Sequence, residues 1–381
     1  MTKNINFTDV NPLSIKDIKN INNRILKVIK KKNFILGNEV SEFEKSFSKI
    51  SKSRFSISCG SGTDALILAL MSLNLNSSDE VIVPGLTYIS TGLSVILNNN
   101  KIVLTDIDDK TGLIAIDKIK KRITKKTKVI IPVNLYGQKV DLRKLRQVVG
   151  KKISIIEDSA QSHFAYSCYS CGNMKITNCC KKEKNDKYAD ISCYSFYPAK
   201  NLGAYGDGGL VATKNKKIYR KLLSLRNLGS TKKHEHTILG MNSRLDTIQA
   251  AVLNIKLKSV LKANENRRNI AKIYDEKLNT IKQIKITKTN PGSSRHLYVI
   301  RTKYRDKLVK YLLNKKISCQ IHYPYSLNRL KPFIKYANKN RNLKNSKKWS
   351  KECLSLPIYP GLKSSKINLV VKEIKNFFKI L

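Results

Sequence analysis

The residue with the clearest chemical setting is Lys200, although lysine is abundant throughout the chain. It lies between an apolar run that ends at Ser195 and a glycine-rich stretch, residues 203–209, which leads into another apolar run at 210–213. Apolar surroundings desolvate an amine and lower its pKa, which makes it a better nucleophile at neutral pH. Glycines let the backbone approach a ligand closely. The segment therefore predicts a lysine that attacks a carbonyl carbon.

A second candidate is the acidic segment Glu157-Asp158-Ser159-Ala160-Gln161, which directly follows the strand-like run 153–156. Carboxylates at the carboxyl end of a parallel strand lie where open α/β sheets bind ligands. A fixed carboxylate at Asp158 is suited to keeping the ring nitrogen of a pyridine cofactor protonated, so that the ring accepts electrons. A carboxylate that caps the next helix is the alternative interpretation of the same residues.

A third candidate is Ser61-Gly62-Thr63-Asp64, which stands directly before an apolar helical segment at residues 65–73. Small and hydroxylic residues at a helix start leave backbone N–H groups free, and the helix dipole favours an anion there. This arrangement suits a phosphate group. An ordinary N-cap by Ser61 or Thr63 explains the pattern equally well.

These candidates must be positioned by an α/β fold. Apolar runs alternate with helical segments from about residue 55 to residue 215, which is typical of a parallel sheet covered by helices. Residues 247–276 predict one long helix, broken at most once, that bridges two domains. We place a large α/β domain at residues 11–255 and a smaller α+β domain at residues 256–381. The expected strands are 81–84, 102–104, 129–133, 153–156, 191–194, 210–213, 298–301 and 317–321, and a helix is expected at 306–314.

The charge of the chain is unusual. It has 381 residues, of which 41% are hydrophobic, as in an ordinary globular protein, but 74 Lys and Arg against 27 Asp and Glu give a formal net charge of +47. Binding to nucleic acid or attraction of an anionic substrate, such as a nucleotide diphosphate, would be functional reasons. The lysines are spread over the whole sequence without a recognisable nucleic-acid-binding module. A general compositional bias is therefore favoured, and we expect no nucleic-acid partner.

Location and redox state follow from what the sequence lacks. The N-terminal segment has no apolar core of a signal peptide, and no apolar run reaches about 18 residues, so we expect a cytoplasmic protein that does not bind membranes. The eight cysteines are too few and too unevenly placed for a disulfide framework. Cys168, Cys171, Cys179 and Cys180 could bind a structural zinc. Their spacing is not that of a standard zinc ribbon or finger, so we expect a surface loop with unpaired thiols and no metal.

Five segments together resemble, in order and spacing, the sugar aminotransferases of the DegT/DnrJ/EryC1/StrS family, over the chain from about residue 30 to the C-terminus. This resemblance implies pyridoxal 5'-phosphate as cofactor. It also implies the aspartate aminotransferase-like fold of PLP-dependent transferases of fold type I, in which a large α/β domain with a mixed sheet is joined to a smaller C-terminal α+β domain. The segments are Ser61-Gly62-Thr63, Thr87-Tyr88, Glu157-Asp158-Ser159-Ala160-Gln161, Ser195-Phe196-Tyr197-Pro198-Ala199-Lys200 and Gly240-Met241-Asn242-Ser243-Arg244-Leu245-Asp246.

The resemblance also implies a role for individual residues. Lys200 would hold the cofactor covalently and then carry a proton between cofactor and substrate. Asp158 would pair with the pyridine nitrogen, Gln161 would bind the ring hydroxyl, and Tyr88 would stack on the ring. The cofactor phosphate would be held by Gly62, Thr63, Ser195 and, from the neighbouring subunit, Asn242. The active site would then be complete only in a homodimer.

The substrate implied by the resemblance is a nucleotide-linked keto sugar, with glutamate as amino donor. The segment 242–246 resembles enzymes that aminate a 3-keto sugar. Enzymes that aminate C4 of an NDP-4-keto-6-deoxyhexose more often carry an aromatic residue after the asparagine, so C3 is expected and C4 is the alternative. Substrate contacts are implied for Arg244, His322, Tyr323 and Arg329.

Two hints about the sugar disagree, and two other functions compete with amino transfer. The segment around His322 and Arg329 resembles a branch in which arginines bind the carboxylate of a 3-keto uronic acid, whereas residues 201–205 resemble enzymes for 3-keto-6-deoxyhexoses. Relatives that dehydrate keto sugars have histidine in place of Lys200. A non-catalytic basic binding protein on the same fold would be expected to lose Lys200 or Asp158, and both are present.

Overall fold

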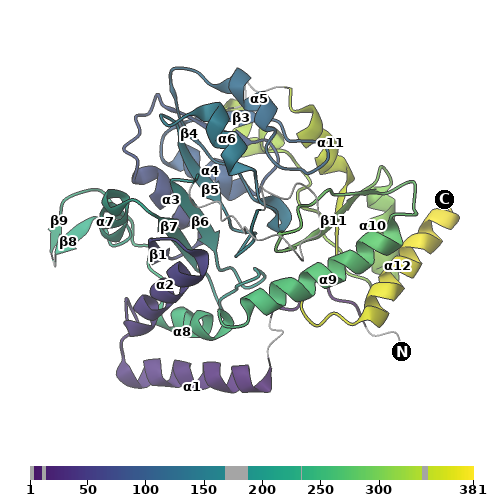
Figure 1. Ribbon diagram of the computed structural model, residues 1–381, viewed down its shortest axis with the longest axis horizontal. Helices are drawn as coiled ribbons and strands as arrows, with labels where there is room; N and C mark the ends of the chain where they lie inside the picture. The colour runs from purple at the N-terminus through teal and green to yellow at the C-terminus, as the bar shows by residue number, and fades with distance from the viewer. Residues whose placement is uncertain (1–3, 11–13, 168–187, 233, 337–341) are drawn as a thin grey trace.

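A seven-stranded mixed sheet forms the centre of the larger part of the molecule (Figure 1). The computed structural model describes residues 4–10, 14–167, 188–232, 234–336 and 342–381. The strand order is β1-β7-β6-β5-β4-β2-β3, and β7 runs antiparallel to both of its neighbours. The alternating pattern alone predicts a parallel sheet, so the direction of β7 differs from that expectation and agrees with the mixed sheet that the family resemblance implies. The strands are β1 (Phe55–Cys59), β2 (Glu80–Pro84), β3 (Lys101–Thr105), β4 (Thr127–Ile130), β5 (Ser154–Asp158), β6 (Ile191–Ser195) and β7 (Gly209–Thr213).

Helices cover both faces of this sheet, which explains why its strands are apolar along nearly their whole length. Val81 and Val83 of β2 pack into one hydrophobic cluster with α3 and α4, while Ile82 between them packs into another cluster with α6 on the opposite face. A third cluster joins α2 and α8 to β6 and β7. The helices of this part are α1 (Ile15–Lys31), α2 (Asn38–Ser51), α3 (Gly62–Met71), α4 (Ile89–Leu97), α5 (Ile116–Ile119), α6 (Leu142–Val149), α7 (Lys216–Leu225) and α8 (Thr247–Lys256).

A smaller antiparallel sheet, in the order β10-β11-β12, lies in the C-terminal part and packs with α9, α10 and α12 around its own apolar cluster. The expected bridging helix is indeed broken once, between α8 and α9, and α9 runs from the larger part to the smaller one beside α12 (Figure 1). The remaining elements are β8 (Ser230–Lys232), β9 (Glu235–His236), α9 (Val260–Leu278), β10 (Lys285–Ile286), β11 (Tyr298–Arg301), α10 (Arg305–Asn314), α11 (Lys344–Glu352), β12 (Cys353–Leu356) and α12 (Ser364–Lys379).

One expected strand is wrong. Residues 317–321 form only two isolated bridges, from Ile317 to Ile5 and from Gln320 to Ser355 of β12. The segment is apolar because Ile317 is buried in the C-terminal cluster, but its hydrogen-bonding partners lie in two different segments and do not continue as a ladder. Among the helices of the described residues, none has both the length and the apolar composition required to cross a bilayer.

Candidate active site

Lys200 lies in a tight loop that connects β6 to β7 at the carboxyl end of β6. The loop folds back on itself: the Lys200 N–H donates to the carbonyl of Tyr197 at 2.8 Å, and the Ala204 N–H donates to the carbonyl of Phe196 at 2.8 Å. A side chain at Gly203 would collide with the Pro198 carbonyl, so the turn requires glycine there. Desolvation lowers the pKa of the Lys200 amine to about 8, against the opposing effect of the Asp158 carboxylate.

Asp158 ends the neighbouring strand β5, whose residues pair in parallel with β6. Its side chain is buried, and the carboxylate accepts hydrogen bonds from the Ala160 N–H (3.1 Å, Oδ1) and from the Thr91 hydroxyl (2.9 Å, Oδ2). Burial raises the pKa of Asp158, whereas these two hydrogen bonds and the charge of Lys200 lower it in part. A carboxylate and an amine thus interact at the same end of two adjacent strands.

Thr91 was not predicted from the sequence, although it makes the side-chain contact that orients Asp158. It lies on α4, one turn after Thr87, and the two hydroxyls share a hydrogen bond of 2.9 Å. The available signal was the spacing of four residues between Thr87, just before α4, and Thr91 in its first turn, which lets the two side chains meet. Nothing in the sequence indicates that this face meets β5.

Gln161 is held between two parts of the chain that are distant in sequence. Its Oε1 accepts a hydrogen bond from the Tyr136 N–H at 2.7 Å, and its Nε2 donates to the hydroxyl of Tyr323 at 2.8 Å. Tyr136 has φ = 62°, in the left-handed region, and this conformation occurs where its N–H meets Gln161. The Tyr323 ring lies 5.7 Å from the ring of Tyr88, which is 56% exposed at the start of α4. The predicted ring-contacting residues therefore gather at one place.

The predicted phosphate-binding residues also come together, at the start of α3. Ser61 is the N-cap, and its hydroxyl accepts from the Asp64 N–H at 3.1 Å, so the ordinary capping interpretation is confirmed. Capping uses one of the first-turn donors and leaves others without a partner inside the helix. The Thr63 hydroxyl shares a hydrogen bond of 2.7 Å with Ser90. A Cβ on Gly62 would lie 2.5 Å from the Cβ of Ser195, so these two residues are in direct contact.

The segment around Asn242 is attached to the same helix start. Ser243 donates to the Asp64 carboxylate at 2.6 Å and accepts from the Gly60 N–H at 3.0 Å. Asn242 itself is exposed, and Arg244 donates to the side chain of Asn227 at 2.9 Å. Within one chain, Asn242 therefore faces outward, and Arg244 has a protein partner.

Of the remaining predicted substrate residues, His322 and Tyr323 reach the site, whereas Arg329 is exposed. The carbonyl of His322 accepts from the Tyr136 hydroxyl at 2.5 Å, its Nδ1 lies 2.9 Å from the Ser355 hydroxyl, and its ring stacks on Phe7. Burial, and to a smaller extent the charge of Lys200, lower the pKa of His322 to about 4. Arg329 ends a short 3-10 turn.

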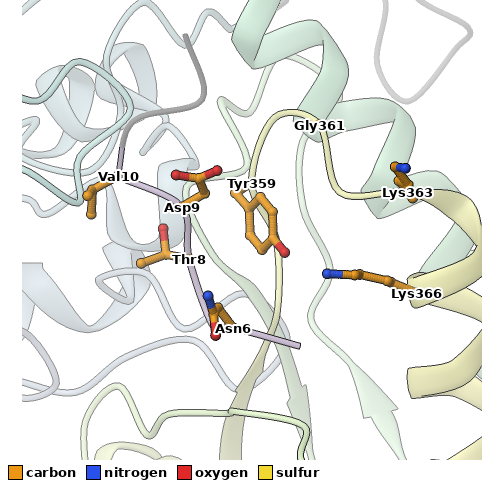
Figure 2. A pocket seen from close by; sticks show the side chains of 8 residues that line it. All are labelled: Asn6, Thr8, Asp9, Val10, Tyr359, Gly361, Lys363 and Lys366. Carbon is orange, nitrogen blue, oxygen red and sulfur yellow. The ribbon is translucent and has the colours of Figure 1, made fainter. Parts of the chain in front are cut away.

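A pocket of about 510 Å³ lies apart from these residues, between the N-terminal segment and the start of α12 (Figure 2). None of the predicted site residues lines it. Its lining consists of Asn6, Thr8, Asp9, Val10, Tyr359, Gly361, Lys363 and Lys366. The described residues contain no group of three or more His, Cys, Asp or Glu that could hold a metal ion, and the four clustered cysteines lie outside the described residues.

The residues that meet at the ends of β5 and β6 fit a phosphorylated pyridine ring. Asp158 supplies a buried carboxylate for a protonated ring nitrogen, and Lys200 supplies an amine whose pKa is lowered to about 8. The start of α3, with Gly62 against Ser195, supplies backbone donors and hydroxyls for a phosphate. The donors and acceptors thus match pyridoxal phosphate at three separate positions.

Comparison with known proteins agrees with this arrangement. A model of the DegT/DnrJ/EryC1/StrS aminotransferase family matches residues 16–375. A UDP-N-acetyl-3-dehydro-alpha-D-glucosamine 3-aminotransferase of Acidithiobacillus ferrooxidans is 34% identical over 352 residues, which cover 92% of this chain and 91% of that protein. A dTDP-3-amino-3,6-dideoxy-alpha-D-galactopyranose transaminase of Aneurinibacillus thermoaerophilus is 34% identical over 98% of this chain and 99% of its own length.

The fold agrees as well. The crystal structure of S. venezuelae DesV, in complex with a ketimine intermediate, superimposes with a TM-score of 0.91 and 31% sequence identity, over 99% of each chain. Similarity in sequence and structure therefore extends over nearly the whole chain, and the range matched by the family model spans both Asp158 and Lys200. The chain belongs to the DegT/DnrJ/EryC1/StrS aminotransferase family.

Proposed function

We propose that the protein is a PLP-dependent aminotransferase that transfers an amino group from glutamate to C3 of a nucleotide-linked 3-keto-hexose, in the synthesis of an amino sugar. The observation that carries this proposal is the meeting of Lys200 and Asp158 at the ends of two adjacent strands, with each group shifting the pKa of the other. Two of the relatives, a 3-aminotransferase and a 3-amino sugar transaminase, support C3 over C4.

Different residues of the chain would serve different steps of this reaction. Pyridoxal phosphate, when bound, supplies a ring that withdraws electrons from the carbon that loses its proton. Lys200 Nζ, whose pKa is lowered to about 8, can accept that proton and return it to the neighbouring atom. Asp158 holds the proton on the ring nitrogen, and Thr91 fixes the orientation of this carboxylate. Tyr88, whose ring lies 5.7 Å from that of Tyr323, would stack on the cofactor ring.

The cofactor is tested first. Reconstituted protein should show an absorbance band in the visible, and borohydride reduction followed by peptide mass analysis should find the cofactor on Lys200. Lys200→Ala should lose both the band and amino transfer, while Lys351→Ala, at an exposed lysine of α11, should keep them. Absence of a band in the reconstituted parent protein would contradict the proposal, and salt-sensitive binding of nucleic acid without amino transfer would favour the basic binding protein.

The position of amination is tested with a matched pair of substrates. Enzyme that has been converted to its amine form by glutamate should react with an NDP-3-keto-hexose and not with the NDP-4-keto-6-deoxyhexose of the same nucleotide. Reaction with the 4-keto sugar alone would overturn the C3 assignment and leave the aminotransferase assignment intact. Adding an NDP-3-keto uronic acid tests whether Arg244 and Arg329 act on a sugar carboxylate, because only that substrate should lose binding when they are replaced by Leu.

The proposal includes a homodimer in which each subunit completes the site of the other. The outward position of Asn242, on a segment bound to the start of α3, supports this arrangement. Lys200→Ala and Asn242→Asp should each be inactive alone. Co-expressed, they should recover up to about a quarter of the parental activity, because a hybrid dimer contains one intact site and one doubly altered site. No recovery in a mixture shown to contain hybrid dimers would contradict shared sites.

A further inference from the structure

The residue that follows Lys200 anchors its loop to the C-terminal part of the chain. Asn201 makes three side-chain hydrogen bonds: Nδ2 donates to Asn264 Oδ1 at 2.7 Å and to the Ser294 carbonyl at 2.9 Å, and Oδ1 lies 2.9 Å from His296 Nδ1. Asn264 lies on α9, and Ser294 and His296 lie in the segment that leads into β11 at Tyr298. Three of the four hydrogen bonds that an amide side chain can make are therefore used.

The direction of these hydrogen bonds determines the tautomer of His296. A backbone carbonyl only accepts, so the Asn201 group facing Ser294 must be the NH₂, and its Oδ1 must face His296. Asn264 is fixed in the same way, because its Nδ2 donates to the carbonyl of His163 at 2.9 Å. Asn201 Oδ1 can only accept, so His296 carries its proton on Nδ1 and donates it.

The segment that carries His296 also holds the two neighbouring loops of the site. The Ser294 hydroxyl lies 3.2 Å from the Gln161 carbonyl, to which it donates, and the Ser294 N–H donates to the Gly137 carbonyl at 2.8 Å. A Cβ on Gly137 would lie 2.6 Å from the His296 nitrogen, so backbone packs directly against backbone there. The same short segment thus contacts the loops after β4, β5 and β6.

We propose that His296 and Asn201 are positioning residues, whose mutual hydrogen bond fixes the loop of Lys200 relative to Asp158 and Gln161. His296 is 8% exposed, and two further bonds of Asn201 lead to Asn264 and Ser294, so the loop has little freedom to shift as a unit. Burial, together with the charge of Lys200, lowers the pKa of His296 well below its usual value, so the ring stays neutral and keeps one tautomer around neutral pH. The expected effect of these residues on catalysis rests on the proposed function.

The test compares two replacements of His296 that differ in where they place a donor. The side-chain nitrogen of Asn is separated from Cα by as many bonds as His Nδ1, whereas that of Gln is one bond further away. His296→Asn should therefore keep the hydrogen bond to Asn201, and His296→Gln should lose it. Asn201→Ala removes this hydrogen bond together with those to Asn264 and Ser294, so it should shift the same readouts in the same direction and by at least as much as His296→Gln. Because both changes remove the bond between His296 and Asn201, the double variant should be no worse than Asn201→Ala.

Two measurements read the position of Lys200. In the cofactor-free protein, an amine-acylating reagent with peptide mass analysis gives the pH dependence of Lys200 labelling. Its midpoint should stay near 8 in His296→Asn and move to higher pH in His296→Gln, where the loosened loop admits water to the amine. In the reconstituted enzyme, His296→Gln should lower kcat about 10- to 100-fold with KM for the keto sugar changed by less than about twofold.

The outcomes separate clearly. Equal labelling profiles in the parent, His296→Gln and Asn201→Ala would overturn the inference, as would equal impairment of the Asn and Gln variants when thermal unfolding shows both to be folded. If His296→Gln does not fold, the labelling midpoint of Asn201→Ala is compared with that of the parent instead, and an unchanged midpoint overturns the inference. Because labelling uses protein without cofactor, it tests the inference even if the reconstituted parent transfers no amino group, in which case the proposed function alone fails.

Discussion

At the level of single residues, the chemistry depends on how Lys200 and Asp158 shift each other's pKa. Desolvation acts in opposite directions on an acid and a base: it raises the pKa of the carboxyl and lowers that of the amine. The attraction between their charges counteracts both shifts. An amine with a pKa of about 8 is therefore the balance of two effects, and it changes in a known direction when either is removed.

The pH dependence of cofactor binding follows from this balance. Unprotonated Lys200 is the reactive form, so the rate at which cofactor-free protein binds pyridoxal phosphate covalently should rise with pH, with a midpoint near 8. Asp158→Asn removes the charge that favours the protonated amine, so the midpoint should move to lower pH. Stopped-flow absorbance at each pH measures it, with the surface variant Glu42→Gln as control. A shift to higher pH in Asp158→Asn would contradict the assigned interaction.

A second residue-level prediction concerns the ion pair of Glu157 with Lys139, both buried. Glu157 also accepts hydrogen bonds from Asn134 at 2.7 Å and Ser192 at 2.8 Å. Burial raises the pKa of Glu157, but these partners lower it by more, so its pKa lies below the usual 4.5. The pair therefore stabilises the fold above pH 4.5, and this stabilisation is lost as the pH falls through the lowered pKa.

Removing one partner of this pair should be costly. Lys139→Met leaves a buried carboxylate without its cation and should lower the free energy of unfolding at pH 8 by about 3–5 kcal/mol. The deficit should shrink toward pH 5, because Glu157 without Lys139 has a higher pKa and becomes neutral. Adding Glu157→Gln should recover much of the loss. Urea unfolding at both pH values measures these differences, and a deficit that grows on acidification would show that the carboxylate is not the cause.

Asp158 could be predicted from the sequence because it ends an apolar strand, and parallel strands end at one edge of a sheet. Lys200 was predicted from its apolar, glycine-rich surroundings, and Gln161 from the family resemblance alone. Thr91 and His296 could not be predicted in this way. Each lies on an element whose approach to the site depends on tertiary packing, and each contacts a residue 67 or 95 positions away in the chain. Their residue types gave no signal either, because threonine is common at helix starts and histidine also occurs in protein cores without a functional role.

At the level of elements, the contact between α3 and β6 determines the shape of the predicted phosphate site. Gly62 begins α3 and touches Ser195, the last residue of β6, so any side chain at position 62 must push the two elements apart. Gly62→Ala should destabilise the protein by about 1–3 kcal/mol through overpacking. Because Ser195→Gly removes the side chain that it meets, the two changes together should fall short of the sum of their separate effects.

Urea unfolding of the cofactor-free protein measures this double-mutant cycle. Gly150→Ala serves as the control: its Cβ has open space, although its positive φ adds a strain that Ser195→Gly cannot relieve, so that pair should be additive. Additive effects at positions 62 and 195 would show that the contact does not limit the approach of α3 to β6. Loss of cofactor affinity beyond the loss of stability would further support the phosphate role of this helix start.

Elements differed in how well the sequence predicted them. Six strands of the large sheet were recognised because both of their faces are buried, which makes them apolar over their full length. The antiparallel direction of β7 leaves no such trace, because residue burial does not depend on strand direction. The wrong strand at residues 317–321 shows the reverse case, in which an apolar segment is buried but its backbone partners do not form a ladder. The boundary between residues 255 and 256 stays a prediction.

At the level of the whole molecule, the 74 Lys and Arg side chains far outnumber the 27 Asp and Glu side chains that could balance their charge. Several of the 27 acidic residues form ion pairs with basic side chains that are themselves largely buried, such as Glu44 with Arg226 and Glu352 with Arg301. These acids do little to balance the lysines spread over the surface. A net charge of +47 should therefore oppose the compact state through repulsion among exposed groups.

This repulsion predicts an unusual dependence of stability on salt. Raising NaCl from about 0.01 M to about 0.15 M shortens the Debye length from about 30 Å to about 8 Å, so distant surface charges are screened while the buried ion pairs are hardly affected. The free energy of unfolding by urea should therefore increase over this range, and the thermal midpoint should rise with it. A variant in which several exposed lysines, such as Lys49, Lys121 and Lys372, are replaced by Glu should show a weaker increase. If the parent protein lost stability with salt, attractive surface pairs would outweigh the repulsion, and the charge excess would have to be distributed far less evenly than the sequence indicates.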